Sequence, residues 1–549
     1  MTDIPDWAER LGRPMRHEAH FGDRVVRCFG QRPSTVHETF AAAVRERPDA
    51  DALVFGSERW RYRALDEEVA RLAAGLRAHG VNAGDRVALF LSNRAEYMVA
   101  VYAVLRLAAI VVPISVREQG AGLAYMLGQC GARAVLFDAD LAARVPDAAS
   151  CPTLALRVVL PPNPIAPVLG PDPAPVTDAV PYETLRGQGR LDEPVTAAEE
   201  DTAVILYTSG TTGRPKGAML SNLGIVHTML HFVACMGLDA GTRSVMAVPA
   251  SHVTGLVANI MTTVAAGGAT IVMASFKARD YLALAARERC SYTILVPAMY
   301  KLCLLDPDFE RHDLSAWRIG GYGGAPMPES TIDELARRLP GLALMNAYGA
   351  TETTSPTTIM PAECTRENLD SVGLVVPCGE IIAVDDDGRE LPRGETGELW
   401  ISGPMVVRGY WDNPEATARE FTAGWWHSGD LGSVDAQGFV RVFDRKKDMI
   451  NRGGYKIFSV EVENLMLGFP GVVEAAVLGR PCPVLGERVH AFVHTAGAEI
   501  DTGALREWCA QRLADYKVPE TITVHAEPLP RNANGKLLKR QLRDALDAG

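Results

Sequence analysis

Hydrophobic and polar positions along the first part of the chain predict helices and strands in turn. Residues 65–76 carry an apolar side chain every three or four positions, which is typical of one face of a helix. Short apolar runs at 87–91 and 110–112 predict buried strands, and residues 95–107 between them predict a helix. Strand, helix and strand in this order indicate βαβ units around a parallel sheet.

A second stretch of the same character runs from residue 202 to about 350. It begins with an apolar strand predicted at 202–206 and closes on another at 342–345. The proline-dense segment 161–175 lies between the two stretches and predicts an irregular surface connection. The pattern therefore predicts two βαβ-type sheet subdomains.

The segment from Ser244 to Phe276 contains no Asp, Glu, Lys or Arg, and it is long enough to cross a membrane as one helix. Pro249 and the pair Gly267 and Gly268 interrupt it and divide it into a strand, a helix and a strand. Burial in a large α/β core explains this composition, so no integral membrane segment is expected.

Beyond these stretches the pattern of predicted helices and strands changes twice. Short strands with glycine turns, as at 397–403 and 438–443, predict a β-rich subdomain over about 378–443. The last hundred residues instead contain two predicted helices and two predicted strands, at 459–467, 502–512, 472–479 and 489–495. We therefore expect an α/β protein with a large N-terminal domain (1–443), a hinge (444–447) and a small mobile α+β C-terminal domain (448–549).

Composition narrows the class of protein. With 549 residues, 47% of them hydrophobic and 22% charged, the chain has the make-up of a soluble globular protein. Its net charge of −12 gives no electrostatic reason to bind nucleic acid. The first residues lack the apolar core of a secretory signal, and the ten cysteines form no Cys-x-x-Cys pair. A cytoplasmic protein with reduced thiols is expected.

The most informative motif is the loop 207–217, which reads Tyr-Thr-Ser-Gly-Thr-Thr-Gly-Arg-Pro-Lys-Gly. Its glycines let backbone N–H groups converge on an anion, its hydroxyl groups add donors, and Arg214 and Lys216 add positive charge. The loop follows the strand at 202–206, and ligands of α/β proteins bind at the carboxyl ends of strands. These features predict a cradle for nucleotide phosphates. The spacing is not that of the common P-loop, because no Gly-Lys-Ser/Thr follows.

Four further segments carry candidate chemistry: Asn346–Glu352, Trp425–Asp430, the charged run with the glycine loop at 444–455, and Pro530–Lys536. Taken singly, each also has a plain structural interpretation, respectively a strand-ending turn, a β-turn, a solvated linker and an exposed lysine. The chemical interpretation uses Tyr348 as a flat face for a base and Glu352 as an oxygen ligand for Mg²⁺. The carboxylate of Asp430 would accept hydrogen bonds from both ribose hydroxyls.

Together these segments closely resemble the adenylate-forming superfamily of acyl-CoA synthetases, peptide-synthetase adenylation domains and firefly luciferase. The resemblance spans about residues 36 to 540 and depends on the joint occurrence of the motifs in order. It implies an acid–thiol ligase that adenylates a carboxylic acid, releases pyrophosphate, passes the acyl group to CoA and releases AMP. It also implies ATP and coenzyme A as substrates and Mg²⁺ as cofactor.

The resemblance assigns the nucleotide-binding roles to three groups of residues. They are the loop residues Thr208, Ser209, Gly210, Thr211, Thr212, Gly213 and Lys216; the adenine slot Gly323, Gly324, Ala325, Pro326, Asn346, Ala347, Tyr348 and Gly349; and the ribose site Asp430 and Arg445. Catalytic roles fall to Lys536, which would bridge the substrate carboxylate and the ATP α-phosphate, to Thr351 near that phosphate, and to Glu352 as the metal ligand.

The remaining implied sites are the acyl pocket, the hinge and the CoA channel. Their residues are His252, Val253, Gly255, Tyr322 and Ala350 in the pocket, Lys447 at the hinge, and Asn451, Gly453 and Gly454 in the channel. No aspartate for a substrate amine stands near His252, which argues against an amino acid as substrate. Aryl acids and medium- or long-chain acids both stay open.

Two alternative functions remain at this point. An acyl-adenylate ligase that delivers to a carrier protein or an amine would share every residue of the ATP site. A non-catalytic nucleotide-binding protein on the same fold is the remote alternative. All the charged residues of the site are present together, which argues against a loss of catalysis. Because the sequence ends soon after Lys536, we expect no fused carrier domain, which favours CoA as the acceptor. The sequence leaves the oligomeric state open, a homodimer included.

Overall fold

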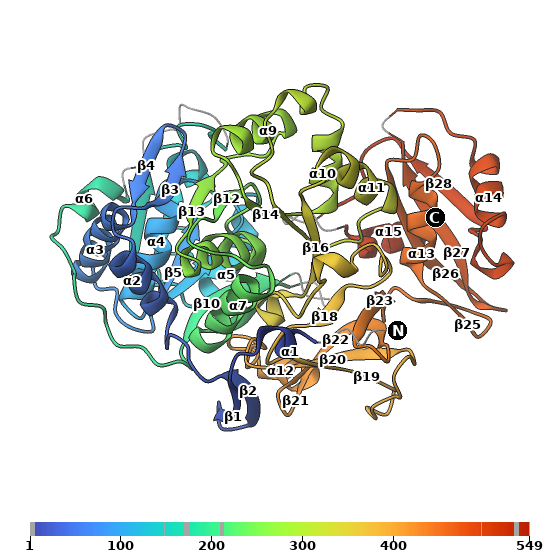
Figure 1. Ribbon diagram of the computed structural model, residues 1–549, viewed down its shortest axis with the longest axis horizontal. Coiled ribbons are helices and arrows are strands. Elements are labelled where there is room, and N and C mark those ends of the chain that lie inside the picture. Colours follow the sequence, from blue (N-terminus) through green and yellow to red (C-terminus); the bar gives the residue numbers. More distant parts are fainter. Residues whose placement is uncertain are drawn as a thin grey trace. The chain divides into compact units, whose positions relative to one another are not determined.

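The computed structural model describes residues 6–147, 149–168, 176, 178–208, 214–495, 497–531 and 537–547 (Figure 1). The chain divides into two compact units. The first unit comprises Met1–Ile381, Ile401–Trp426 and Gln437–Phe439, and the second comprises Ile382–Trp400, His427–Ala436 and Val440–Gly549. The mixed α/β class expected from the sequence is confirmed, whereas the hinge at 444–447 and the domain limits around it stay predictions.

One sheet of the first unit has seven strands in the order β11-β10-β6-β5-β7-β8-β9. They are β11 (Lys216–Ser221), β10 (Thr202–Thr208), β6 (Ile110–Pro113), β5 (Arg86–Phe90), β7 (Ala134–Asp138), β8 (Leu156–Leu160) and β9 (Val180–Pro181). All neighbours are parallel except β10 and β11, which form an antiparallel pair. The strands predicted at 87–91, 110–112 and 202–206 are therefore present, and β11 is a strand that the sequence did not predict.

The second sheet of this unit runs β18-β17-β16-β15-β14-β12-β13-β3-β4. Its strands are β18 (Gly373–Val375), β17 (Thr358–Ile359), β16 (Ala343–Tyr348), β15 (Ile319–Tyr322), β14 (Tyr292–Leu295), β12 (Arg243–Met246), β13 (Ala269–Val272), β3 (Asp51–Phe55) and β4 (Glu58–Arg61). The prediction that residues 202 to 350 form one sheet subdomain is wrong in part. The first two strands of that stretch, β10 and β11, join the other sheet, while β3 and β4 from the chain's start join this one.

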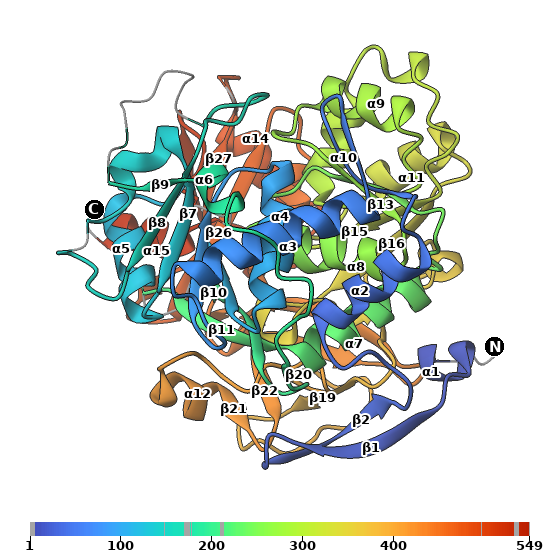
Figure 2. The ribbon, with the colours of Figure 1, turned by 90° about the vertical axis from the view of Figure 1, so that its left-hand side faces the viewer.

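Helices cover the two sheets and also lie between them. The helices of the first unit are α1 (Trp7–Leu11), α2 (Val36–Glu46), α3 (Tyr62–Ala78), α4 (Ala95–Arg106), α5 (Gly120–Gln129), α6 (Tyr182–Arg186), α7 (Asn222–Cys235), α8 (Thr262–Ala265), α9 (Ala278–Arg287), α10 (Pro297–Leu304), α11 (Glu329–Arg338) and α12 (Pro414–Glu420). Figure 2 shows α3 and α4 between the strands of the two sheets. Nearly every residue of α4 is buried, because it packs on β5 and β6 on one side and β3 on the other. The helices predicted at 65–76 and 95–107 are confirmed.

The charge-free segment forms β12, a helix and β13, as predicted. Most of the helix, Thr254–Met261, has π geometry, and α8 continues it. Two side chains favour that wider turn, because Asn259 donates to the Thr254 carbonyl (2.9 Å) and Thr262 donates to the Val257 carbonyl (2.8 Å), each five residues back. Among the helices of the described residues, none is long and apolar enough to cross a membrane.

The second unit contains a five-stranded sheet of its own, in the order β25-β24-β27-β26 with β28 beside β27. Its strands are β24 (Ile450–Arg452), β25 (Tyr455–Ile457), β26 (Glu474–Cys482), β27 (Gly486–His494) and β28 (Thr521–His525), and its helices are α13 (Ser459–Leu467), α14 (Thr502–Ala510) and α15 (Lys539–Asp547). Apolar residues of β26, β27, α13 and α14 share one core. The predicted C-terminal helices and strands are all present, with boundaries shifted by a few residues.

The remaining strands confirm the short-strand pattern of the β-rich segment. They are β19 (Glu380–Val384), β20 (Gly397–Ser402), β21 (Phe421–Thr422), β22 (Trp425–Val434) and β23 (Phe439–Arg445), while β1 (Met15–His20) and β2 (Arg24–Phe29) form a hairpin near the start of the chain. The strands β22 and β23 pair with one another in antiparallel register over Asp430–Val434 and Val440–Arg445. This pairing places Asp430 opposite Arg445 on the neighbouring strand.

Three histidines are buried in the first unit without charge. Burial, with the nearby Arg106 guanidinium, lowers the pKa of His37 to about 3; burial also lowers the pKa of His227 to about 4 and that of His231 well below its usual value. His37 accepts a hydrogen bond from Arg106 Nε (3.1 Å), and His227 accepts one from the Phe29 N–H (3.2 Å). In His37 and His227 the accepting ring nitrogen must be unprotonated, in agreement with the lowered pKa values.

We expect acid to destabilise this unit well above the range in which carboxylates titrate. Below pH ~6.5 the unfolded chain protonates the three histidines and the folded chain does not, so the free energy of unfolding falls by up to ~4 kcal/mol per pH unit. Denaturant titrations at pH 7.5 and 5.5 measure this slope. His37→Gln should reduce it, whereas replacement of the exposed His17 by Gln should not. Equal slopes in both variants would contradict the explanation.

Candidate active site

The predicted phosphate loop connects two antiparallel strands. β10 ends at Thr208 and β11 begins at Lys216, and these two residues are direct partners in the hairpin. Thr208 and Lys216 therefore lie at the base of the loop, at the carboxyl end of β10. This is where the sequence analysis predicted a site for nucleotide phosphates. Residues Ser209, Gly210, Thr211, Thr212 and Gly213 lie outside the described residues.

Lys216 is buried, with 7% of its side chain exposed, and it points into a cluster of polar side chains. Its Nζ lies 2.5 Å from Glu420 Oε2 and 4.1 Å from the centre of the Tyr410 ring. The Tyr410 hydroxyl is in turn 2.6 Å from Glu420 Oε2 and 2.9 Å from Glu352 Oε1. The structure thus connects the lysine of the loop to the predicted metal ligand through a tyrosine and a glutamate.

Glu352 fits a divalent cation. It lies in a short 3-10 turn, Thr351–Thr353, directly after β16, and only 8% of the residue is exposed. Its Oε1 atom contacts Tyr410 and, at 3.4 Å, the Thr208 hydroxyl. Within the part of the chain that the structure describes, no donor contacts Oε2. A buried carboxylate with one oxygen available beside a phosphate loop is the donor that Mg²⁺ prefers.

The residues of the predicted adenine slot lie where two adjacent parallel strands end. Tyr322 on β15 is the register partner of Asn346 on β16, and the segments 323–326 and 346–349 follow the two strands. A Cβ atom on Gly323 would lie 2.3 Å from the Ala347 carbonyl oxygen, so only glycine fits at this contact. The chain thereby brings the two halves of the slot together, next to Thr351 and Glu352.

The predicted acyl-pocket residues lie at the same edge of this sheet. His252 and Val253 follow β12 and Gly255 lies in the π-helical turn, while Tyr322 ends β15 and Ala350 follows β16. Burial lowers the pKa of His252 and raises that of Tyr322 to about 12, so both rings are neutral near pH 7. His252 accepts a hydrogen bond from the Thr254 N–H at 3.3 Å. The five predicted acyl-pocket side chains therefore carry no charge near pH 7.

In the second unit the predicted ribose residues form an ion pair. Asp430 and Arg445 are register partners on β22 and β23, and Arg445 Nε lies 2.8 Å from Asp430 Oδ1. Arg445 also donates to the Ser428 carbonyl at 3.0 Å, which fixes the guanidinium beside the strand. Asp430 is 4% exposed and lies in a strand, so the β-turn interpretation of this motif is wrong.

We expect Asp430→Asn to weaken the binding of ATP by roughly tenfold to a hundredfold, because a charged acceptor of ribose hydroxyls is lost. The measurement is the Kd or KM for ATP compared with that for 2′-deoxy-ATP. The wild type should prefer ATP, and the variant should lose much of that preference. If the variant kept the full preference, Asp430 would not be the ribose ligand.

The predicted hinge and CoA-channel residues follow β23. Lys447 is exposed, and partial desolvation of its ammonium group lowers the pKa of that group. Asn451 is on β24, and Gly453 and Gly454 form the two-residue turn to β25 with φ of +61° and +90°. A turn with two positive φ values is the tight hairpin type that favours glycine, so these glycines have a local structural reason whatever else they do. Lys536 lies outside the described residues.

Comparison with known proteins decides the family. Residues 40–411 match the model of the AMP-binding enzyme family, and residues 461–536 match the C-terminal domain of AMP-binding enzymes. The chain belongs to the AMP-binding enzyme family.

Curated relatives of this AMP-binding enzyme include acyl-CoA ligases. It is 35% identical over 500 residues to a feruloyl-CoA synthase from Amycolatopsis, covering 91% of this chain and 96% of that protein. It is 32% identical over 496 residues to the long-chain-fatty-acid–CoA ligase FadD13 of Mycobacterium tuberculosis, covering 89% and 94%. The predicted class, an acid–thiol ligase of the acyl-CoA synthetase family, is confirmed.

A solved relative shows the ligands of one family member. The o-succinylbenzoate CoA synthetase of Bacillus subtilis in complex with ATP and magnesium ion superposes with a TM-score of 0.80 and 27% identity, over 93% of this chain and 99% of that one. The predicted α/β fold with a large N-terminal part and a small C-terminal domain is confirmed by this similarity and by the match to the C-terminal domain family.

Residues that the sequence analysis missed surround the predicted ones in this AMP-binding enzyme. Tyr410 and Glu420 contact Lys216, yet they follow no pattern that signals chemistry, since one lies in a loop and the other ends α12. In the second unit Asp444 is 3% exposed and accepts hydrogen bonds from the Ser459 and Arg445 N–H groups. The charged run is therefore not merely a solvated linker at its first residue.

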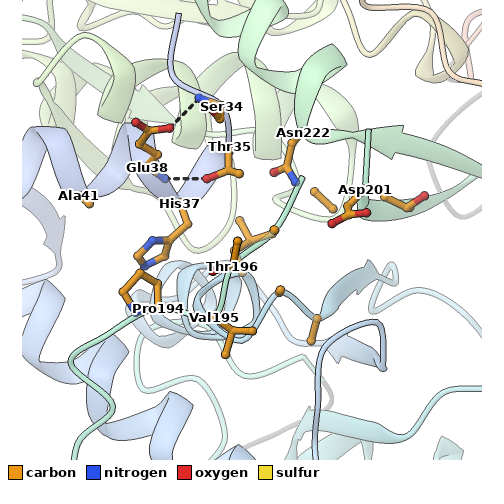
Figure 3. Close-up of a pocket in the computed structure, with 16 residues that line it drawn as sticks. Ser34, Thr35, His37, Glu38, Ala41, Pro194, Val195, Thr196, Asp201 and Asn222 are labelled. Carbon is orange, nitrogen blue, oxygen red and sulfur yellow. Dashed lines mark hydrogen bonds between the residues drawn. The ribbon is translucent and has the colours of Figure 1, made fainter. Parts of the chain in front are cut away.

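A cavity of about 270 Å³ elsewhere in the first unit is not part of this site (Figure 3). It is lined by the first turn of α2 and by the start of β10 near Thr202. The phosphate loop follows the other end of β10, about 20 Å away at the usual rise per residue. Glu38 in this cavity accepts from the Ser34 N–H (2.6 Å) and donates its own N–H to Thr35 (3.0 Å), so its polar groups cap the helix.

Proposed function

We propose that this protein activates an aryl acid or a medium- to long-chain acid with ATP and transfers the acyl group to coenzyme A. The observation that carries the proposal is the convergence of Lys216 and Glu352, through Tyr410, at the base of the phosphate loop. A cation for phosphates beside a carboxylate for Mg²⁺ is the arrangement that ATP-dependent adenylation needs.

In the first half-reaction a carboxylate oxygen of the substrate attacks the α-phosphorus of ATP. The new O–P bond replaces the bond to pyrophosphate, which leaves with the electron pair. Two anions meet in this step, so its barrier is largely electrostatic. Lys216 and the loop would hold the β- and γ-phosphates, and Lys536 would bridge the attacking carboxylate and the α-phosphate. Mg²⁺ bound to Glu352 would neutralise charge on the phosphates.

In the second half-reaction the thiol sulfur of CoA attacks the acyl carbon. The C–S bond forms, the C–O bond to AMP breaks, and AMP leaves. A lysine that bridges the reactants in the first half-reaction would obstruct the thiol's path in the second. We therefore propose that residues 448–549, which carry Lys536, move about a hinge at Lys447. Asn451, Gly453 and Gly454 would then line the channel for pantetheine, where bulky side chains would obstruct it.

The proposal on the substrate is supported by the neutral lining of His252, Val253, Gly255, Tyr322 and Ala350. The relatives include a feruloyl-CoA synthase and a long-chain-fatty-acid–CoA ligase, which support an aryl acid and a long-chain acid respectively. We further propose a cytoplasmic protein that binds no nucleic acid, which the ten free cysteines and the net charge of −12 support.

A panel of carboxylic acids tests the proposal. Each aryl, medium-chain and long-chain acid is incubated with ATP, Mg²⁺ and CoA, and AMP and the acyl thioester are both measured. The expected result is stoichiometric AMP and acyl-CoA for one class of acids. An acyl-adenylate ligase for a carrier protein or an amine would instead form AMP slowly with CoA and quickly with its own acceptor, and this outcome would overturn the assignment of CoA.

A further inference from the structure

Glu420 is the last residue of α12, and its carboxylate joins three side chains. Its Oε2 atom lies 2.5 Å from Lys216 Nζ and 2.6 Å from the Tyr410 hydroxyl, and its Oε1 accepts from Arg419 at 2.8 Å. A lysine that is 7% exposed needs a fixed counter-charge, because an unpaired charge at that depth is strongly unfavourable. Glu420 supplies the counter-charge, and it thereby determines where Nζ lies.

Backbone hydrogen bonds hold the residues of this cluster together. The segment 409–411 pairs with β11, since the Met219 N–H donates to the Gly409 carbonyl (3.1 Å) and the Trp411 N–H donates to the Gly217 carbonyl (2.7 Å). This pairing fixes Tyr410 alongside the first residues of β11. The N-cap Asn413 then starts α12, whose last residue returns to Tyr410 and Lys216.

The hydroxyl group of Tyr410 carries one proton and lies within hydrogen-bond distance of two carboxylates. Its hydroxyl oxygen lies 2.9 Å from Glu352 Oε1 and 2.6 Å from Glu420 Oε2. A hydroxyl donates to one acceptor at a time, so stronger donation to one carboxylate weakens donation to the other. A change in the hydrogen bond from Tyr410 to Glu352 therefore changes the hydrogen bond from Tyr410 to Glu420. Through Glu420 it also changes the ion pair with Lys216.

We propose that Glu420 is a positioning residue of the ATP site, which holds Lys216 for the phosphates and connects it through Tyr410 to the metal ligand Glu352. The inference rests on the proposed function, because it takes Lys216 as a phosphate ligand. It adds two residues, Glu420 and Tyr410, and a reason why phosphate binding and metal binding at this site depend on one another.

Equilibrium binding of ATP with saturating Mg²⁺, measured by calorimetry without any acid, tests the proposal. We expect Glu420→Gln to bind ATP about tenfold more weakly than the wild type, since a close charge pair fixes Lys216. The matched control is Glu415→Gln, an exposed glutamate on the same helix, which should bind as the wild type does. In a Lys216→Met background, Glu420→Gln should have no further effect, because Glu420 acts through the lysine.

Other results would overturn the proposal. Tighter binding of ATP by Glu420→Gln would make Glu420 a competitor for Lys216, and an undiminished effect in the Lys216→Met background would mean that it acts elsewhere. A lower melting temperature with unchanged ATP affinity would reduce Glu420 to a structural role. Tyr410→Phe should raise the Mg²⁺ concentration needed for half-maximal ATP binding, and no change would remove the connection to Glu352. Since no acid is used, these outcomes stay separate from any failure to find a substrate.

Discussion

Replacement of Lys536 by alanine should reduce adenylation ~100-fold or more, while thioester formation from preformed acyl-adenylate stays nearly intact. The lysine would bridge two anions only in the first half-reaction, so its charge stabilises only that transition state. The two half-reactions are measured separately, as pyrophosphate release from acid and ATP, and as acyl-CoA formation from synthetic acyl-adenylate and CoA.

The control for this variant is Arg540→Ala, which removes an exposed cation from the same C-terminal segment and should leave both half-reactions unchanged. An equal loss in both half-reactions of Lys536→Ala would contradict a role confined to adenylation. Loss in the Arg540 variant as well would point to a general effect of positive charge in this segment.

Replacement of Glu352 by glutamine should reduce adenylation by a factor of ~100 to 1,000 at a fixed Mg²⁺ concentration. Glutamine keeps the shape and can still accept a hydrogen bond from Tyr410, so the loss isolates the charge that a divalent cation requires. Rates are measured over a range of free Mg²⁺ at saturating ATP, and the concentration for half-maximal rate should rise.

Glu367→Gln serves as the matched control, because Glu367 is exposed a short distance along the same chain segment. It should leave the Mg²⁺ dependence unchanged. If Glu352→Gln lowered the rate without any change in the Mg²⁺ dependence, Glu352 would contribute to the site by another route than metal binding.

The sequence predicted the parts of the fold that depend on local periodicity. Helix α3, the strands β5 and β6, and the elements of the second unit carry their pattern within ten to twenty residues, so apolar spacing was sufficient. Strand β11 was not predicted because two of its six residues, Lys216 and Gly217, interrupt the apolar pattern of a strand. The exchange of strands between the two sheets depends on long-range packing that no local pattern records.

Some residues of the candidate site could likewise be predicted from local sequence motifs, and others could not. Lys216, Glu352 and Asp430 stand in motifs with a fixed order, and the structure places each where a strand ends or pairs. Tyr410 and Glu420 were not predicted, since their importance comes only from contacts across about two hundred residues of chain. A tyrosine in a loop and a glutamate at a helix end are ordinary features until their neighbours are known.

The most direct test of the central claim is carboxylic-acid-dependent exchange of labelled pyrophosphate into ATP, without CoA. We expect that at least one aryl or medium- to long-chain acid supports exchange, that exchange requires Mg²⁺, and that it stops in Glu352→Gln. If a sample that binds ATP supported no exchange with any of these acids, the protein would not form acyl-adenylates, which would contradict the proposed function.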